Sequence, residues 1–169
     1  WRAPRRGEGL GNQFLANIRE TDAIAHVVRC FEDPNVVHVE GSVDPLRDIE
    51  TIETELLLKD LDTVSKRLLR VAKSVKTGDK GAKAEADFLA RLEEHLGDGL
   101  PARTLEVSDQ EAVLLREQFL LSAKPVLYVA NVGEGDLPDG NAYVEQVRER
   151  AEAEGAGVVL ISAEFEAQL

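Results

Sequence analysis

The hydrophobic positions of this 169-residue chain follow two different periods. Short runs rich in apolar, mostly β-branched residues occur at 23–30, 36–39, 126–130 and 158–161, and such runs are typical of strands. Longer segments with apolar residues three and four apart separate them and are typical of helices. Because strands that alternate with helices form mostly parallel sheets, we expect an α/β fold with a mostly parallel sheet flanked by helices.

The longest helical segment begins at Asp44-Pro45, where Asp suits the N-cap and Pro the first helical position. We expect this helix to run to about Lys76. Its apolar positions have coiled-coil spacing and are Leu61, Val64, Leu68, Val71 and Val75. A second helix is expected over 82–96, with one apolar side made of Ala82, Ala86, Leu89, Leu92 and Leu96. The simplest assembly is an antiparallel helical hairpin inserted between two sheet segments.

Three further helices are predicted outside the hairpin. One spans 12–20, and one follows the capping box Ser108-Asp109-Gln110-Glu111 and runs to about Ser122. The last contains Tyr143 and Val147 and ends at Gly155.

Composition narrows the class of protein. A net charge of −12 argues against a generally basic nucleic-acid binder, so no DNA partner is expected. A single cysteine, Cys30, allows no internal disulfide, and no apolar run approaches the roughly 20 residues that span a bilayer. We therefore expect a cytoplasmic protein with no membrane partner.

The histidines are scattered, so no metal site is expected, and Cys30 at a strand end is interpreted as a buried small hydrophobic residue.

Basic residues concentrate in the hairpin. Eight of the 20 basic residues lie within 59–83, against three of the 32 acidic residues. A basic arm on an acidic body is a plausible RNA-facing element, although an ordinary solvated helix face fits equally well. The residues expected to contact RNA or the ribosome are Lys66, Arg67, Arg70, Lys73, Lys76 and Lys80.

The apolar run 126–130 ends in Asn131, and Glu134 follows three residues later. Ligands of open α/β sheets bind outside the carboxyl ends of the strands. An Asn amide offers a donor and an acceptor, whereas a carboxylate offers only acceptors, and this combination suits the polar edge of a nucleobase. Asn and Gly are also common in turns, so a plain turn is the alternative interpretation.

The segment from Gly7-Glu8-Gly9-Leu10-Gly11 to Ala23 resembles the YchF, or Obg-like, ATPases. The resemblance continues through 26–31 and 37–61 and covers nearly all of 7–169. It implies a partial P-loop NTPase fold with an inserted antiparallel coiled-coil arm. The nucleotide-binding domain would comprise 1–59 and 105–169, and the arm would be 60–104.

The same resemblance assigns nucleotide-binding roles. Asn131-Val132-Gly133-Glu134 matches the family's Asn-x-x-Glu motif, in which Asn131 would contact adenine beside the Val132 backbone. Glu134 would replace the Asp with which related proteins read guanine, and the backbone of Ser162-Ala163 would close over the base. The implied ligands of the intact protein are ATP or ADP with Mg²⁺, and its implied partner is the ribosome with its rRNA.

The 169 residues contain no G-x-x-x-x-G-K-[ST] phosphate loop, and the Asp-x-x-Gly expected before Gly7 is replaced by the basic segment 1–6. That loop carries the phosphate-binding amides and the Mg²⁺-binding hydroxyl, so no catalytic residue is assigned and the chain alone is expected not to hydrolyse ATP. With no Met in the sequence, we expect a fragment of a larger protein. Two alternatives remain open. The chain could be a non-catalytic RNA- or protein-binding module that acts through the arm, or a piece whose sheet exposes apolar faces and unpaired edges.

Overall fold

The computed structural model describes residues 22–32 and 42–163. The predicted helix 12–20 and strand 36–39 therefore lie outside the described residues. The described chain forms two compact units, a helical unit over Glu53–Lys124 and a sheet unit made of Ala23–Ile52 and 125–163. Helix α2 (Pro45–Lys76) contributes residues to both units, and each unit is described by itself below.

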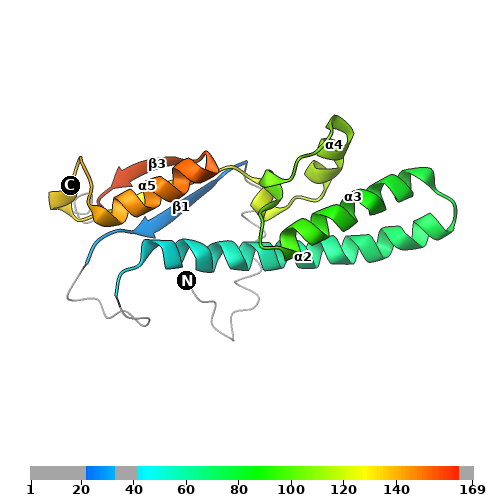
Figure 1. Ribbon diagram of the computed structural model, residues 1–169, viewed down its shortest axis with the longest axis horizontal. Coiled ribbons are helices and arrows are strands. Elements are labelled where there is room, and N and C mark those ends of the chain that lie inside the picture. The colour runs from blue at the N-terminus through cyan, green and yellow to red at the C-terminus, as the bar shows by residue number, and fades with distance from the viewer. Residues whose placement is uncertain (1–21, 33–41, 164–169) are drawn as a thin grey trace. The chain divides into compact units, whose positions relative to one another are not determined.

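The sheet unit contains three parallel strands in the order β1 (Ile24–Arg29), β2 (Val126–Asn131) and β3 (Gly157–Ile161) (Figure 1). Their register aligns Arg29, Asn131 and Ile161 at the carboxyl edge. The parallel α/β arrangement predicted from the apolar runs is confirmed. The central strand extends one residue past the predicted 126–130, so Asn131 itself is part of β2.

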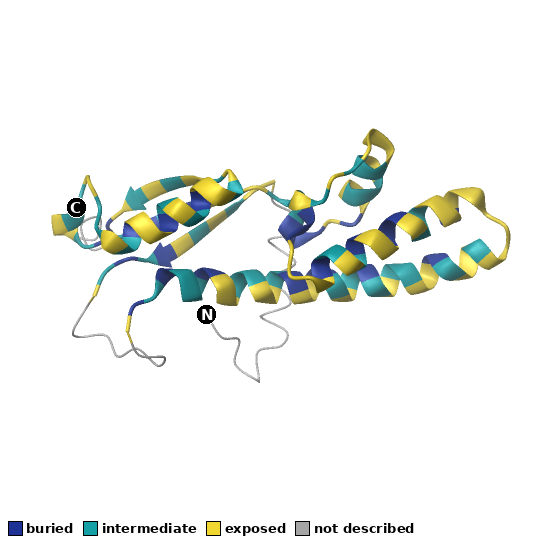
Figure 2. Ribbon diagram, in the orientation of Figure 1, coloured by how far each residue is buried: buried dark blue, intermediate teal, exposed yellow. Residues whose placement is uncertain are grey.

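One face of the sheet is buried. Helix α5 (Ala142–Glu154) packs Val144 and Val147 against it, and Ile49 from the start of α2 joins the same core with Val28 and Tyr128. The buried residues of α5 and of β1 are dark blue in Figure 2, whereas β3 is only half-buried. Asn141 caps the first turn of α5, and Gly155 ends the helix at φ +69°, in the left-handed region that glycine favours.

The opposite face of the sheet carries aliphatic side chains that remain in water. Register brings together Val27, Val129 and Val159 on this face, with Leu127 and Ile161 beside them. Val27 is 59% exposed and Val159 is 44% exposed. The exposed apolar face expected of a partial sheet is therefore present in the part of the chain that the structure describes.

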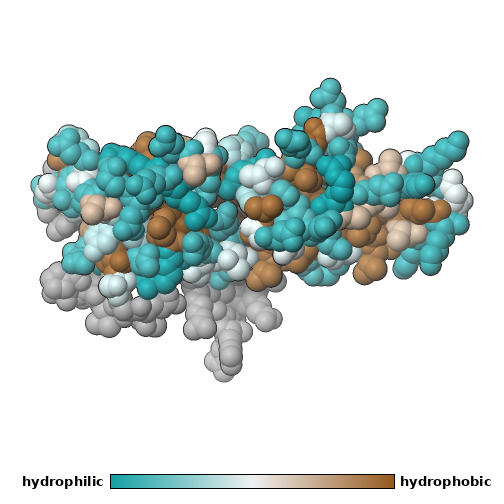
Figure 3. Space-filling model, viewed as in Figure 1, coloured by the Kyte–Doolittle hydropathy of each residue, from teal (hydrophilic) through white to brown (hydrophobic). Residues whose placement is uncertain are grey.

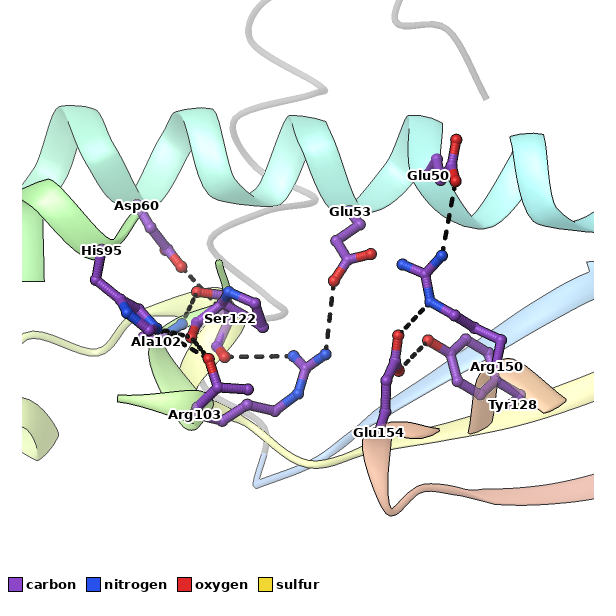
Figure 4. A network of polar contacts seen from close by, with 12 residues as sticks. Glu50, Glu53, Asp60, His95, Ala102, Arg103, Ser122, Tyr128, Arg150 and Glu154 are labelled. Carbon is purple, nitrogen blue, oxygen red and sulfur yellow. Dashed lines mark hydrogen bonds and ion pairs between the residues drawn. The ribbon is translucent and has the colours of Figure 1, made fainter. Parts of the chain in front are cut away.

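A polar network joins α5 to β2 within the sheet unit (Figure 4). The buried Tyr128 hydroxyl donates to Glu154 Oε2 at 2.6 Å, and the Glu154 carboxylate also pairs with Arg150. Arg150 reaches Glu50 on α2 at 3.7 Å. The network satisfies a tyrosine hydroxyl that the apolar core would otherwise leave without a partner.

His26 on β1 lies against Tyr128, with 5.8 Å between the ring centroids. Burial lowers the pKa of His26 from its usual value of 6.5, against the opposing attraction of Asp48 and Glu154. The unfolded chain therefore binds the proton more readily, and stability should fall as pH drops below about 6.5 toward the folded-state pKa. Urea denaturation at pH 7.5 and pH 5.5 should show a larger loss of stability for the wild type than for His26→Gln. Equal losses in the two proteins would contradict this assignment.

In the helical unit, α2 and α3 (Lys80–Gly97) form the predicted antiparallel hairpin (Figure 1). Val64 and Val71 of the predicted stripe are fully enclosed, and they share a core with Leu89 and Leu92. The core also contains Phe88, which the predicted apolar side of α3 did not include. The second helix begins at Lys80 rather than Ala82, because Asp79 Oδ1 accepts the backbone N–H groups of Gly81 and Ala82 at 2.9 and 3.2 Å.

Ser108 and Glu111 form the predicted capping box at the start of α4 (Asp109–Glu117). The prediction that this helix runs to Ser122 is wrong. The helix stops at Glu117, Phe119 adopts φ +51°, and the short 3-10 helix η3 (Leu121–Ala123) follows. The reason is a long-range contact, because the carboxylate of the buried Asp60 on α2 accepts the backbone N–H groups of Leu121 and Ser122.

Asp60 belongs to a polar network inside the helical unit (Figure 4). The Ser122 hydroxyl accepts the Ala102 N–H at 2.9 Å, at the start of the 3-10 helix η2 (Ala102–Thr104). Arg103 donates to the Ser122 carbonyl at 3.3 Å and pairs with Glu53 at 3.7 Å. Three separate segments of this unit are thereby fixed to one another through buried or half-buried polar groups.

The surface of the hairpin is mixed, with hydrophobic patches among hydrophilic side chains on the side visible in Figure 3. Leu58 and Leu69 of α2 are 61% and 70% exposed. Within residues 22–32 and 42–163, none of the helices has the length and apolar character needed to cross a bilayer.

Candidate functional site

The carboxyl edge of the sheet brings together the ends of all three strands. The Cys30 N–H donates to the Asn131 carbonyl at 2.8 Å, and the Val132 N–H donates to the Ile161 carbonyl at 2.8 Å. The end of β2 is therefore bonded on both sides. This double pairing holds the backbone of Asn131 and Val132 rigidly in the middle of the edge.

The side chain of Asn131 is fixed by the segment that follows β3. The Ala163 N–H donates to Asn131 Oδ1 at 3.2 Å, so two motifs 32 residues apart meet directly. With Oδ1 engaged, the Nδ2 donors of Asn131 keep no hydrogen-bond partner among the residues that the structure describes, and the side chain is only half-buried. A polar group held in this way can donate to a ligand without reorganising.

The other residues predicted to bind the nucleotide differ in how far they are buried. Val132 and Ser162 are buried, whereas Ala163 is exposed at the edge. Glu134 is exposed at the start of the 3-10 helix η4 (Glu134–Asp136). Asn131, Val132, Ser162 and Ala163 thus lie together, and Glu134 lies on the loop that leaves this point.

Sequence reasoning missed a residue that ties this loop to the sheet. Asn141 Nδ2 donates to the Cys30 carbonyl at 2.8 Å and to Asp136 Oδ2 at 2.9 Å. Its Oδ1 accepts the Val144 N–H at 3.1 Å. The only available signal was an Asn directly before a helical pattern, which indicates an N-cap but not the two longer-range bonds.

Cys30 lies beneath the same edge and is fully buried, as expected from the sequence. Burial, with the nearby charge of Asp48, raises the pKa of its thiol to about 11. The thiol therefore stays protonated at neutral pH and is a poor nucleophile.

The six cations predicted to contact RNA fall into two groups. Lys66 pairs with Asp62 and Arg67 pairs with Glu85 of α3, each at 2.9 Å. The second group lies toward the tip of the hairpin and has no ion pair with any of the described residues; it comprises Arg70, Lys73, Lys76 and Lys80, all exposed. We call these four residues the tip cations. Asp79, the acid closest to them in sequence, is occupied as the N-cap of α3.

Curated proteins match nearly the whole chain. It is 47% identical over 166 residues to the ribosome-binding ATPase YchF of Bacillus subtilis and 49% identical over 164 residues to the protein of that name from Escherichia coli O157:H7, with 97% of this chain covered in each case. Over the segment it spans, the chain belongs to the YchF family. It spans about 45% of the length of these relatives. No protein-family model matches the chain.

A solved structure extends the YchF assignment to the fold. The Schizosaccharomyces pombe YchF GTPase superimposes with a TM-score of 0.83 at 34% sequence identity. The alignment covers 98% of this chain and 46% of that one. The family resemblance inferred from the residues is therefore confirmed, together with the class of fold that it implied.

Proposed function

We propose that Asn131, Val132, Glu134, Ser162 and Ala163 form the nucleobase-binding half of an adenine-nucleotide site. The site would belong to a longer ribosome-binding ATPase of the YchF family, in which nucleotide state regulates ribosome binding. The hydrogen bond from Ala163 N–H to Asn131 Oδ1 carries this proposal, because it joins the two base-binding motifs at the carboxyl edge of a parallel sheet.

The chemistry of the edge favours adenine. Asn131 Nδ2 can donate to a ring nitrogen of the base, since its Oδ1 is already engaged. The Glu134 carboxylate only accepts hydrogen bonds, so it suits the exocyclic amino group of adenine. Guanine has a carbonyl oxygen at that position, which a carboxylate repels. Glu134 is exposed, so its side chain is free to turn toward a base.

Phosphate and Mg²⁺ binding are assigned to the longer protein. The 169 residues lack the phosphate-loop motif. That motif carries the Mg²⁺-binding hydroxyl, so we assign the Mg²⁺ contact to the longer protein as well. ATP hydrolysis is accordingly proposed for the intact protein, and the residues described here would select the base.

A second function, RNA contact, is favoured by the tip cations. Their charges remain available to phosphate groups, whereas Lys66 and Arg67 are partly neutralised by acids within the hairpin. The relatives named above are called ribosome-binding, and rRNA presents a dense array of phosphates. We assign the electrostatic contact with rRNA to the tip of the arm.

The nucleobase site is tested by titrating the ¹⁵N-labelled chain with ATP, ADP and GTP and following backbone amide resonances. Two or three hydrogen bonds with stacking correspond to a Kd on the order of 1 mM. ATP and ADP should shift the amides of 131–136 and 162–163 at similar concentrations, and GTP should shift them less. Shifts confined to other regions, or an equal response to GTP, would contradict the proposal.

A further inference from the structure

Asn141 joins three elements at the candidate site. Its Nδ2 bonds the end of β1 through the Cys30 carbonyl and the loop through Asp136, while its Oδ1 caps α5. An N-cap needs only the side-chain oxygen, which accepts the N–H of Val144. The two bonds from Nδ2 are therefore not needed to cap α5, and they connect the end of β1 to the loop.

The loop from 133 to 140 is closed by its own hydrogen bonds. The Asp136 N–H donates to the Gly133 carbonyl at 3.0 Å, and the Gly140 N–H donates to the Asp136 carbonyl at 2.7 Å. Gly140 has φ +95°, and a Cβ there would lie 3.2 Å from Val144 Cγ1 and 3.3 Å from Leu160 Cδ2. Any other residue would be strained in this turn, which leads directly to Asn141.

We propose that Asn141 is a positioning residue for the nucleobase loop, which holds the Glu134 segment against the carboxyl edge of the sheet. The inference rests on the proposed adenine site. Asn141 touches no base in this arrangement, because its donor and acceptor are both engaged within the protein. It acts by fixing Asp136, two residues after Glu134, to the carbonyl of Cys30, whose N–H pairs with Asn131. Both ends of the Asn-x-x-Glu motif are thus linked by hydrogen bonds to Cys30, at the end of β1.

Two substitutions separate this role from helix capping. Asn141→Ser retains a good N-cap but removes the Nδ2 donor, so α5 should remain intact. Asp136→Ala removes the carboxylate that accepts from Asn141 Nδ2, and it keeps the N-cap bond between Asn141 Oδ1 and the Val144 N–H. Asp139→Ala is the matched control, because Asp139 is an exposed acid of the same loop whose carboxylate has no recorded partner among the described residues.

Amide hydrogen exchange of the full 169-residue chain without nucleotide provides the decisive measurement. Exchange at the amides of residues 136 and 140 should accelerate at least tenfold in Asn141→Ser, and exchange at Gly140 should accelerate as much in Asp136→Ala. Both amides should be unchanged in Asp139→Ala. Amides in the middle of α5 should keep their protection in all three variants. Unchanged exchange at Asp136 and Gly140 in Asn141→Ser, or equal acceleration throughout α5, would overturn the proposal.

Titration with ATP then separates this inference from the proposed function. Where the wild-type chain binds ATP at the edge, Asn141→Ser should raise the Kd at least threefold and reduce the preference for ATP over GTP, with Asp139→Ala unchanged. An unaltered Kd in Asn141→Ser would overturn the positioning role. If the wild type gives no ATP-dependent shifts at 131–136, the adenine site itself is wrong, while the exchange data still decide whether Asn141 holds the loop.

Discussion

Replacing Asp60 by Ala should lower the free energy of unfolding of this chain by about 3 kcal/mol or more. The side chain is 1% exposed, and its two oxygens accept the Leu121 N–H at 2.8 Å and the Ser122 N–H at 2.7 Å. Hydrogen bonds to a charged group are worth about 1.5–3 kcal/mol each, and truncation would leave two buried donors without a partner. Urea denaturation followed by helical circular dichroism measures the loss.

Asp62→Ala is the matched control for this prediction. Asp62 lies on the same helix, and its carboxylate forms an exposed ion pair with Lys66. Exposed pairs of this kind contribute about 0.5 kcal/mol or less, so this variant should unfold close to the wild type. Asp60→Asn should also be destabilised, because an amide has one acceptor oxygen and would direct its NH₂ group at a second donor. Equal stabilities for Asp60→Ala and Asp62→Ala would show that the buried carboxylate does not organise the unit.

Reversing the four tip cations to Glu should weaken binding to purified 70S ribosomes more than 100-fold near 100 mM salt. Each phosphate contact contributes a slope of about 0.7–0.9 to the dependence of log affinity on log salt concentration. Four lost contacts should therefore reduce that slope by about 3, in addition to the repulsion from the new carboxylates. Sedimentation with ribosomes over a series of salt concentrations gives both quantities.

Two double variants locate the contact along the arm. Arg70→Glu with Lys73→Glu reverses two tip cations, whereas Lys66→Glu with Arg67→Glu reverses two cations that already pair with Asp62 and Glu85. The substitutions match in number and type, so the tip pair should lose more affinity than the paired residues. Equal losses would remove the assignment to the tip, and retained binding in the quadruple variant would exclude the arm as an RNA contact.

Much of the fold could be read from local signals. Asp44-Pro45 marked the start of α2, the capping box marked the start of α4, and apolar runs marked β1, β2 and β3. These features depend on residues within one or two turns of each other, so a sequence pattern captures them. The same is true of Asn131, whose position at a strand end followed from the length of the apolar run.

Sequence patterns carried no information where distant residues decide the local conformation. The end of α4 is set by Asp60, 61 residues before Leu121, and no pattern near 118–122 contains that information. The position of the loop at 133–140 depends on a bond between Asn141 and Cys30, which are 111 residues apart. In both cases a buried or half-buried polar group satisfies backbone atoms of another segment, and such partners emerge only from the folded arrangement.

The candidate site shows the same division. Motif resemblance supplied Asn131, Glu134 and Ala163, and the structure adds the direct bond between Asn131 and Ala163. The sequence predicted that a partial sheet would expose an apolar face, but it did not predict that this face contains Val27 and Val159. Which side of the sheet is left uncovered depends on where α2 and α5 pack.

The adenine site is tested most directly by comparing ATP titrations of the wild-type chain and of Asn131→Ala, with the amide resonances of 132–136 and 162–163 as the readout. The substitution removes the Nδ2 donor and the acceptor for Ala163 N–H, and it leaves the backbone pairing of β2 in place. We predict ATP-dependent shifts in the wild type, a weaker response to GTP, and loss of the ATP response in Asn131→Ala. An ATP response of the same size in both proteins would contradict the assignment of this edge as the base-selecting half of the site.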